Sequence, residues 1–166
     1  MSGETRITIR PYLDQDWDAI CQVHDRAQPG EFEGTFDFPV VSPLAENTNL
    51  KRFFPQCHRF VACDQDRIVG FIAIYQNQIS LLYIDPDYQG RGIGGRLLQL
   101  AINIIGSPVW TVTVAGNQKA LRFYQRAGFE VMDQFGGQVQ QQSCKFVRLR
   151  RVGPCQLQSS KLQSSK

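Results

Sequence analysis

Apolar positions recur along the chain with two spacings, which predict strands and helices in alternation. Ile7 and Ile9 alternate with polar neighbours until Pro11, as in a strand with one buried face. Further apolar runs rich in β-branched or aromatic residues predict strands at 59–63, 68–75, 79–85, 109–115, 129–135 and 144–150. Apolar residues three or four positions apart predict helices at 14–27, 44–54, 93–105 and 118–127. We expect a mixed α/β domain with about seven strands and about four helices.

The order of these elements indicates how the strands pair. Short turns separate strands 59–63, 68–75 and 79–85, which predicts an antiparallel meander. A helix stands between strand 79–85 and strand 109–115, and a strand–helix–strand unit of this kind pairs its strands in parallel. The last two strands predict a hairpin whose arms are joined by 136–142. The sheet should therefore be mostly antiparallel, with one parallel βαβ unit.

Length and composition are those of one soluble globular domain, which we place at residues 1–152. The chain has 166 residues, of which 42% are hydrophobic and 20% charged. Residues 153–166 end in a polar repeat and predict a mobile tail. The net charge of +3 is too small to argue for nucleic acid. No apolar run approaches the roughly 20 residues of a membrane span, and residues 1–5 carry no apolar signal region, so we expect a cytoplasmic protein.

The five cysteines show no spacing of a disulfide framework or a zinc ribbon. Their number is odd and no Cys-x-x-Cys occurs. Cys21 and His24 share a helical face, but no further Cys or His stands at a useful spacing, so a core role is favoured. We expect free thiols in a reducing cytosol and no metal.

The strongest chemical signal is the glycine turn, Gln89–Gly95, which reads Gln-Gly-Arg-Gly-Ile-Gly-Gly. It lies between strand 79–85 and helix 93–105, so backbone N–H groups at the helix start can bind an anion. Glycines lack Cβ, which lets a diphosphate approach the main chain. Arg91 and Arg96 add positive charge. We interpret the turn as a site for the phosphates of a cofactor.

Two common phosphate loops fit this turn poorly. A Walker loop needs a Lys-Ser/Thr pair after its last glycine, whereas Gly95 is followed by Arg96 and Leu97. The glycines do match the dinucleotide pattern, but that pattern also needs an acidic residue about 20 positions on. No Asp or Glu occurs between Asp87 and Glu130. A nicotinamide-dependent oxidoreductase is therefore disfavoured.

The same segment is rich in cations, which suits a ligand with more phosphate than NAD. Coenzyme A, with its extra 3′-phosphate, is such a ligand. The cations are Arg91, Arg96, Lys119, Arg122 and Arg126.

Two motifs in this order resemble the GNAT superfamily of acetyl-CoA-dependent N-acetyltransferases. Residues Gln89–Gly94 match the motif Gln/Arg-x-x-Gly-x-Gly/Ala. The block Asn117–Phe129 is similar to a second conserved block, and Ile7–Pro11 resembles the usual first strand. The likeness covers roughly residues 5–151. It implies an acyltransferase with the GNAT-like fold, moving an acetyl group from acetyl-CoA to a primary amine.

The resemblance also implies how acetyl-CoA is held. The backbone of the fourth strand would pair with pantetheine where the fourth and fifth strands splay apart, here at Leu82, Tyr83 and Ile84. The 3′-phosphate would meet Lys119 or Arg122. The pyrophosphate would bind the residues Gln89, Gly90, Arg91, Gly92, Ile93, Gly94 and Gly95.

By the same resemblance, Tyr124 is the general acid that protonates the departing thiolate. A phenol with a reference pKa of about 10 keeps its proton at neutral pH. Asn117 is a good N-cap for the following helix, and it would also bind pantetheine or position Tyr124. In the 28–43 loop, Glu31, Phe32 and Glu33 suit a cationic amine substrate through charge and ring-face contact.

The general base and the acceptor stay open. Some GNAT enzymes carry a glutamate on the fourth strand, where this chain has Gln78. Asp85, Glu31 or Glu33 acting through water are alternatives, as is direct attack by a neutral amine. The acceptor is a peptide N-terminus, a lysine, a polyamine or an antibiotic, and the protein a monomer or a homodimer. The competing function is a non-catalytic acyl-CoA-binding regulator.

Overall fold

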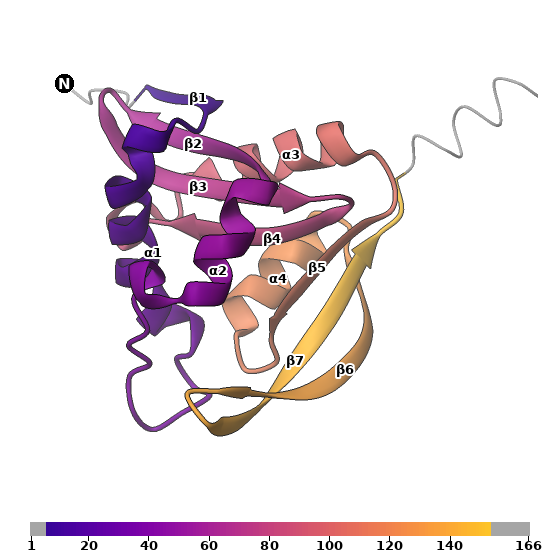
Figure 1. The fold of residues 1–166 in the computed structure, drawn as a ribbon. Coiled ribbons are helices and arrows are strands. Elements are labelled where there is room, and N and C mark those ends of the chain that lie inside the picture. The colour runs from indigo at the N-terminus through magenta and orange to yellow at the C-terminus, as the bar shows by residue number, and fades with distance from the viewer. Residues whose placement is uncertain (1–5, 154–166) are drawn as a thin grey trace, which may run out of the picture.

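A seven-stranded sheet forms the centre of the computed structural model, which describes residues 6–153 (Figure 1). The strands are β1 (Ile7–Pro11), β2 (His58–Asp64), β3 (Arg67–Tyr75), β4 (Gln78–Ile84), β5 (Val109–Val114), β6 (Glu130–Val139) and β7 (Gln142–Arg151). The helices are α1 (Trp17–Glu31), α2 (Thr48–Phe53), α3 (Ile93–Ile105) and α4 (Gln118–Arg126). The mixed α/β class expected from the sequence is confirmed.

The strand order is β1-β2-β3-β4-β5-β7-β6. Strands β1 to β4 form an antiparallel meander, and β5, β7 and β6 pair antiparallel at the other side. Strands β4 and β5 form the single parallel pair of the described sheet, with α3 as their connection. The predicted βαβ unit is therefore present.

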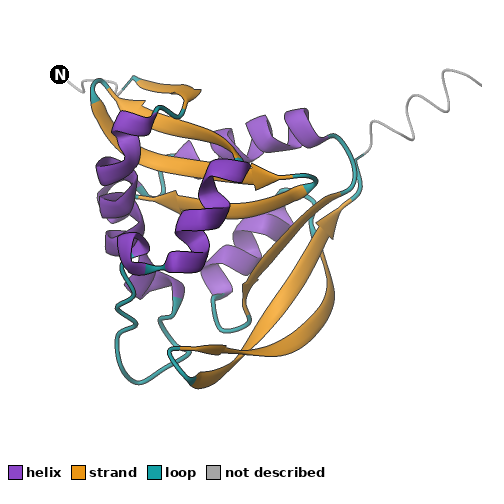
Figure 2. Ribbon diagram, viewed as in Figure 1, coloured by secondary structure: helices purple, strands orange, loops and turns teal. Residues whose placement is uncertain are grey.

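The helices cover both faces of the sheet (Figure 2). One core contains α1, α2 and one face of β2 to β4, with Ile20, Phe54 and Phe71 at its centre. The other core lies under α3 and α4 and contains Ile72 and Leu97. Because both faces of β3 are buried, its sequence is a continuous apolar run rather than an alternating one.

The first helix is longer than its sequence pattern predicts. It continues through Pro29 to Glu31, whereas the sequence favoured a loop from Gln28 onward. A proline removes one helix hydrogen bond, and the packing of the last turn offsets that loss. Gln28 is buried, and its side-chain oxygen accepts a hydrogen bond from Ser42 N–H at 2.9 Å. Glu31 is consequently the last residue of a helix.

The final hairpin is also longer than predicted. Its arms continue through Gly136 and Gly137 to a two-residue turn at Gln140 and Gln141, both of which have positive φ. Gly137 serves close packing, since a Cβ added there would lie 2.7 Å from the Phe146 ring. The expectation that 136–142 forms the connection is wrong for this reason.

The predicted helix at 44–54 is shorter than expected. Helix α2 begins at Thr48, where Asn47 accepts a hydrogen bond from Leu50 N–H at 3.0 Å and caps the helix.

Within residues 6–153 no helix has both the length and the apolarity needed to cross a membrane. The four cysteines of this part are buried and free. The predicted tail lies outside the described residues, apart from Gly153.

Candidate active site

The glycine turn joins β4 to α3 and leaves backbone donors without partners. Gly90 and Gly92 have φ values of 76° and 82°, which other residues rarely adopt. Gly92 is the N-cap of α3, and no side chain caps the helix. The first helical hydrogen bond runs from Arg96 N–H to the Gly92 carbonyl at 3.1 Å. The N–H groups at the start of α3 therefore point outward with the positive end of the helix dipole, as an anion site requires.

The turn has one open side and one packed side. A Cβ added at Gly90, Gly92 or Gly95 would meet no atom within 4 Å. At Gly94 it would lie 3.5 Å from the Phe123 ring. The open side is thus bare backbone, and a diphosphate fits there in a way that side chains would prevent.

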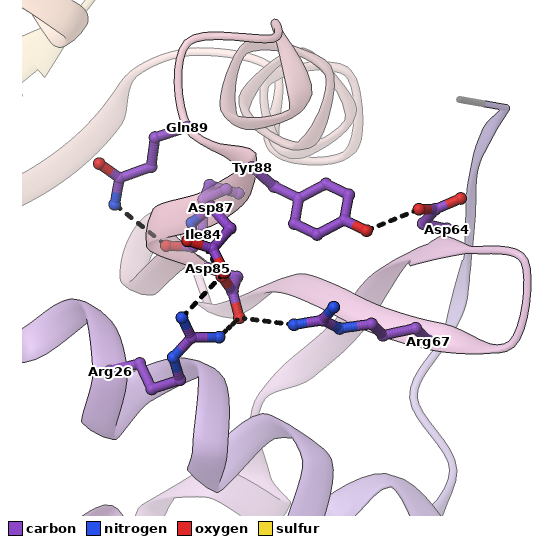
Figure 3. Close-up of polar contacts among 8 residues, drawn as sticks. All are labelled: Arg26, Asp64, Arg67, Ile84, Asp85, Asp87, Tyr88 and Gln89. Carbon is purple, nitrogen blue, oxygen red and sulfur yellow. Dashed lines mark hydrogen bonds and ion pairs between the residues drawn. The ribbon is translucent and has the colours of Figure 1, made fainter. Parts of the chain in front are cut away.

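The start of the turn is held in place by the buried carboxylate of Asp85 (Figure 3). One oxygen accepts a hydrogen bond from Asp87 N–H at 2.9 Å. The other accepts one from Arg26 at 2.7 Å and lies 3.6 Å from Arg67. Arg26 also contacts Asp87 at 3.0 Å. Asp85 is fully engaged as an anchor that joins α1 and β3 to the turn.

Two further contacts fix the rest of the turn. The Tyr88 hydroxyl donates to Asp64 at 2.7 Å, and Gln89 donates its side-chain amide to the Ile84 carbonyl at 3.1 Å (Figure 3). Lys119, from α4, donates to the Gln89 side chain at 2.8 Å. The predicted cofactor residues Gln89 and Lys119 therefore lie together at one end of the glycine turn.

Strands β4 and β5 separate below this turn. Only two register pairs join them, Gln78 with Trp110 and Ile79 with Thr111. A bulge places Ser80 out of register with β3 at the same point. From there β4 pairs only with β3, while β5 pairs with β7. Figure 1 shows the two strands diverging. The unpaired edge of β4 carries Leu82, Tyr83 and Ile84, the residues that the family resemblance assigned to pairing with pantetheine.

Tyr124 lies where the two strands part. Its ring packs between Phe123 and Phe129, with centroids at 5.1 and 5.2 Å, and only 7% of the residue is exposed. Burial raises the pKa of Tyr124 to about 12, and the adjacent Thr111 hydroxyl opposes part of that rise. Thr111 itself donates to the Ile79 carbonyl at 3.2 Å, the last link between the strands.

Glu31 approaches the same place from the opposite layer. The Tyr83 hydroxyl donates a hydrogen bond to a Glu31 carboxylate oxygen at 2.9 Å. Burial raises the pKa of Glu31, and the hydrogen bond from Tyr83 counters this in part. The pKa of Tyr83 is raised well above its usual value by burial and by the negative charge of Glu31. Glu31 also contributes to the raised pKa of Tyr124, so the two groups share one electrostatic environment.

We call the gap between the diverging strands β4 and β5 the opening. The segment after α1 and the tip of the β6–β7 hairpin pack together against Val114, at the end of β5. We call residues 31–41 and 137–145 the front wall. Phe32 is buried against Val40, Val114 and Cys144. At the tip, Gln140 donates its side-chain amide to the Val41 carbonyl at 2.6 Å. Glu33, in contrast, is exposed.

The structure places several predicted site residues near one another. Asn117 caps α4 by accepting a hydrogen bond from Ala120 N–H at 3.1 Å, as predicted. Among residues 6–153, however, no hydrogen bond joins Asn117 to Tyr124. Sequence reasoning missed Thr111 and the anchoring role of Asp85. Neither carries a local signal, because both act through contacts with segments far away along the chain.

A second hollow, a polar cleft of about 630 Å³, lies between α1 and the β2–β3 turn. Its arginines already face carboxylates: Arg10 contacts Asp16 at 2.7 Å, and Arg26 contacts Asp85. An anion would gain little there, since the positive charge is neutralised. In the described part of the chain, no three His, Cys, Asp or Glu side chains form a group suited to a metal ion.

Comparisons with known proteins show the family to which the chain belongs. The model of the acetyltransferase (GNAT) domain family matches residues 29–151. A protein of Salmonella typhimurium named peptidyl-lysine N-acetyltransferase YjaB is 36% identical over 128 residues, which cover 75% of this chain and 84% of the relative.

Solved structures share the fold. The apo form of YjaB from Escherichia coli superposes with a TM-score of 0.69 at 22% identity, covering 89% of this chain and 99% of that one. The PaiA N-acetyltransferase of Thermoplasma acidophilum, solved with coenzyme A, gives a TM-score of 0.67 at 18% identity, covering 89% and 99%. The chain belongs to the GNAT family and is an acyltransferase of that family.

Proposed function

We propose that this protein transfers the acetyl group of acetyl-CoA to a primary amine by direct attack of the amine on the thioester. The observation that carries the proposal is the continuity of three features. The uncapped amino end of α3 lies above the unpaired edge of β4, and the phenol of Tyr124 lies beside Thr111 at the end of that edge. In acetyl-CoA, the diphosphate, the pantetheine arm and the thioester follow one another in the same order as these three features.

In this proposal the backbone binds most of the donor. The N–H groups of the glycine turn bind the diphosphate, and Lys119 meets the 3′-phosphate. Pantetheine extends along Leu82, Tyr83 and Ile84 like an added strand, with its amides paired to the free backbone of β4. A backbone N–H there stabilises the thioester oxygen as it becomes negative.

Tyr124 acts on the leaving group. The amine nitrogen bonds to the thioester carbon, and the C–S bond then breaks with its electron pair on sulfur. A phenol whose pKa is raised to about 12 stays protonated at neutral pH. It therefore donates a hydrogen bond that strengthens as charge grows on sulfur, and the sulfur leaves as a thiol. Asn117 contributes by fixing the start of the helix that carries Tyr124.

The acceptor side is the front wall. Glu31 offers a carboxylate to a cationic amine, Phe32 shapes the wall, and Glu33 adds negative charge at the exposed rim. Because the relative from Salmonella typhimurium is named a peptidyl-lysine N-acetyltransferase, we propose the side-chain amine of a peptide lysine as acceptor.

The test is release of free thiol from acetyl-CoA by the purified protein with a panel of amines. The panel contains a lysine peptide with a blocked N-terminus, a peptide with a free N-terminus, a polyamine and an aminoglycoside. We expect amine-dependent thiol release and an acetylated lysine peptide by mass spectrometry. Binding of CoA without thiol release with any amine, unchanged in Tyr124→Phe, would instead indicate a regulator. Thermal stabilisation by NAD(H) but not by CoA would contradict the donor assignment.

A further inference from the structure

The carboxylates near the opening differ in what else they bind. Asp85 is held by two guanidinium groups and a backbone N–H, and its place is in the anchor of the glycine turn. Glu33 is exposed on the front wall. Glu31 is half-buried, and its negative charge contributes to the raised pKa of Tyr124. Of these three carboxylates, Glu31 is the one held against the stretch of β4 that does not pair with β5, through the 2.9 Å hydrogen bond from Tyr83. It is therefore the best placed of the three to exchange a proton beside the thioester.

Tyr83 holds this carboxylate in a defined position. Its ring stacks on Phe71 at 5.8 Å between centroids and contacts the buried His24 ring at 4.8 Å. The hydroxyl at the end of that packed ring reaches one oxygen of Glu31. A carboxylate accepts hydrogen bonds at both oxygens, so the second oxygen of Glu31 stays available for an amine.

The groups around Glu31 come from every layer that meets the opening. Tyr83 lies on β4, Tyr124 on α4 and Cys144 on β7, while His24, on α1, contacts the Tyr83 ring. The two tyrosines and Cys144 are uncharged at neutral pH. Burial, which disfavours the charged carboxylate, thus raises the proton affinity of Glu31. A general base works best when its pKa approaches the operating pH.

We propose that Glu31 takes the proton from the attacking amine, and that Tyr83 positions Glu31 for that step. The inference rests on the proposed acetyl transfer and adds the base that the sequence left open. The acid and the base then flank the thioester from opposite layers, with Tyr124 on α4 behind the sheet and Glu31 at the end of α1 in front of it (Figure 1).

The protons balance over one turnover. An ammonium binds against Glu31, gives it one proton, and that proton passes to solvent. The neutral amine forms the C–N bond, and the C–S bond breaks as Tyr124 gives its proton to sulfur. The nitrogen of the new amide loses its extra proton to Glu31. Transfer of that proton from Glu31 to the phenoxide of Tyr124 restores both groups.

The experiment compares Glu31→Gln and Tyr83→Phe with the wild type over a range of pH. The readout is thiol release at saturating acetyl-CoA with the blocked lysine peptide, and acetyl-CoA affinity is measured by calorimetry. For Glu31→Gln we expect kcat/KM to fall by about 100-fold or more, with loss of the acidic limb of the profile and unchanged acetyl-CoA affinity.

Tyr83→Phe moves the acidic limb in a direction that a purely structural role would not produce. The hydrogen bond from Tyr83 lowers the pKa of Glu31, so its removal should shift the limb to higher pH. Matched controls are Glu46→Gln, an exposed glutamate between α1 and α2, and Tyr75→Phe on β3. Both should keep the wild-type profile.

Three outcomes separate this inference from the proposed function. A wild-type protein that releases no thiol with any amine contradicts both. A Glu31→Gln variant that keeps the wild-type rate and limb overturns the base while leaving acetyl transfer intact. A Glu31→Gln variant with a higher acceptor KM and an unchanged kcat shows that Glu31 only binds the amine, which also overturns the base.

Discussion

The glycine turn and the front wall lie at the carboxyl ends of β4 and β5, and they are specified in different ways. The turn is a continuous segment, Gln89–Gly95, whose shape depends on positive φ at two glycines and on the start of α3. The front wall is assembled from α1, the segment after it and the β6–β7 hairpin tip. A site made of backbone groups is encoded by a local segment and tolerates few substitutions of its glycines. A wall made from distant segments depends on long-range contacts, and substitutions in it can alter which substrate is bound.

The largest expected effect is at the turn. Gly92→Val places a side chain in the open space beside the first helical N–H groups and forces φ = 82° on a β-branched residue. Loss of the backbone anion site should weaken acetyl-CoA binding by at least about 100-fold, as measured by calorimetry. The control is Gly106→Ala at the other end of α3, where φ is 86°. It should lower stability and keep affinity; a Gly92→Val variant that folds and binds CoA would refute the assignment of the turn.

Tyr124 tests the junction between the two regions. Tyr124→Phe keeps the packing with Phe123 and Phe129 and removes only the hydroxyl. We expect kcat to fall by roughly 10- to 100-fold, because a single proton donor is lost, with acetyl-CoA affinity within about twofold of wild type. Tyr12→Phe, in the other core, serves as control. Equal weakening of turnover and acetyl-CoA affinity would show that Tyr124 binds the donor rather than protonating the thiolate.

The front wall can be loosened without touching the turn. Gln140→Asn keeps a residue that tolerates positive φ but is too short to reach the Val41 carbonyl. The acceptor KM should rise by about two- to fivefold, the worth of one neutral hydrogen bond, while the KM for acetyl-CoA stays constant. Gln141→Asn, at the second turn position, is the matched control. A change in acetyl-CoA KM alone would show that the two regions are not separable.

The smallest effect concerns the 3′-phosphate. Lys119 is exposed and bound to Gln89, so its charge is worth only a few-fold in affinity. Wild-type protein should prefer CoA over dephospho-CoA, and Lys119→Gln should reduce that preference by about two- to threefold. Lys51→Gln, on α2, should leave the preference unchanged. An equal loss for both ligands would assign Lys119 to another part of the cofactor.

The same contrast explains what could be predicted from sequence. The antiparallel meander, the βαβ unit, the glycine turn and the cap at Asn117 follow from local patterns, namely apolar period, glycine at positive φ and an N-cap side chain. The end of α1 could not be predicted, because Pro29 and the glycine after it are typical of a loop. The contact of Gln28 with Ser42 stabilises the helix there, and Ser42 is far along the chain. The Gly136–Gly137 pair resembles a turn, although both glycines are paired in the β6–β7 hairpin and Gly137 packs against Phe146.

The site residues divide in the same way. Residues of the turn could be named from the motif, and Tyr124 from its place in the second block. The pairing of Glu31 with Tyr83 spans 52 positions, and the anchoring of Asp85 by Arg26 spans 59. No local pattern reports such contacts, so the sequence alone leaves the general base open.

The measurement that tests the account most directly is a crystal structure of the protein with acetyl-CoA. The account predicts diphosphate oxygens within hydrogen-bond distance of the N–H groups at the start of α3, and the thioester sulfur beside the Tyr124 hydroxyl. A diphosphate bound instead among Arg10, Arg26 and Arg67 in the polar cleft, or a sulfur remote from Tyr124, would contradict it.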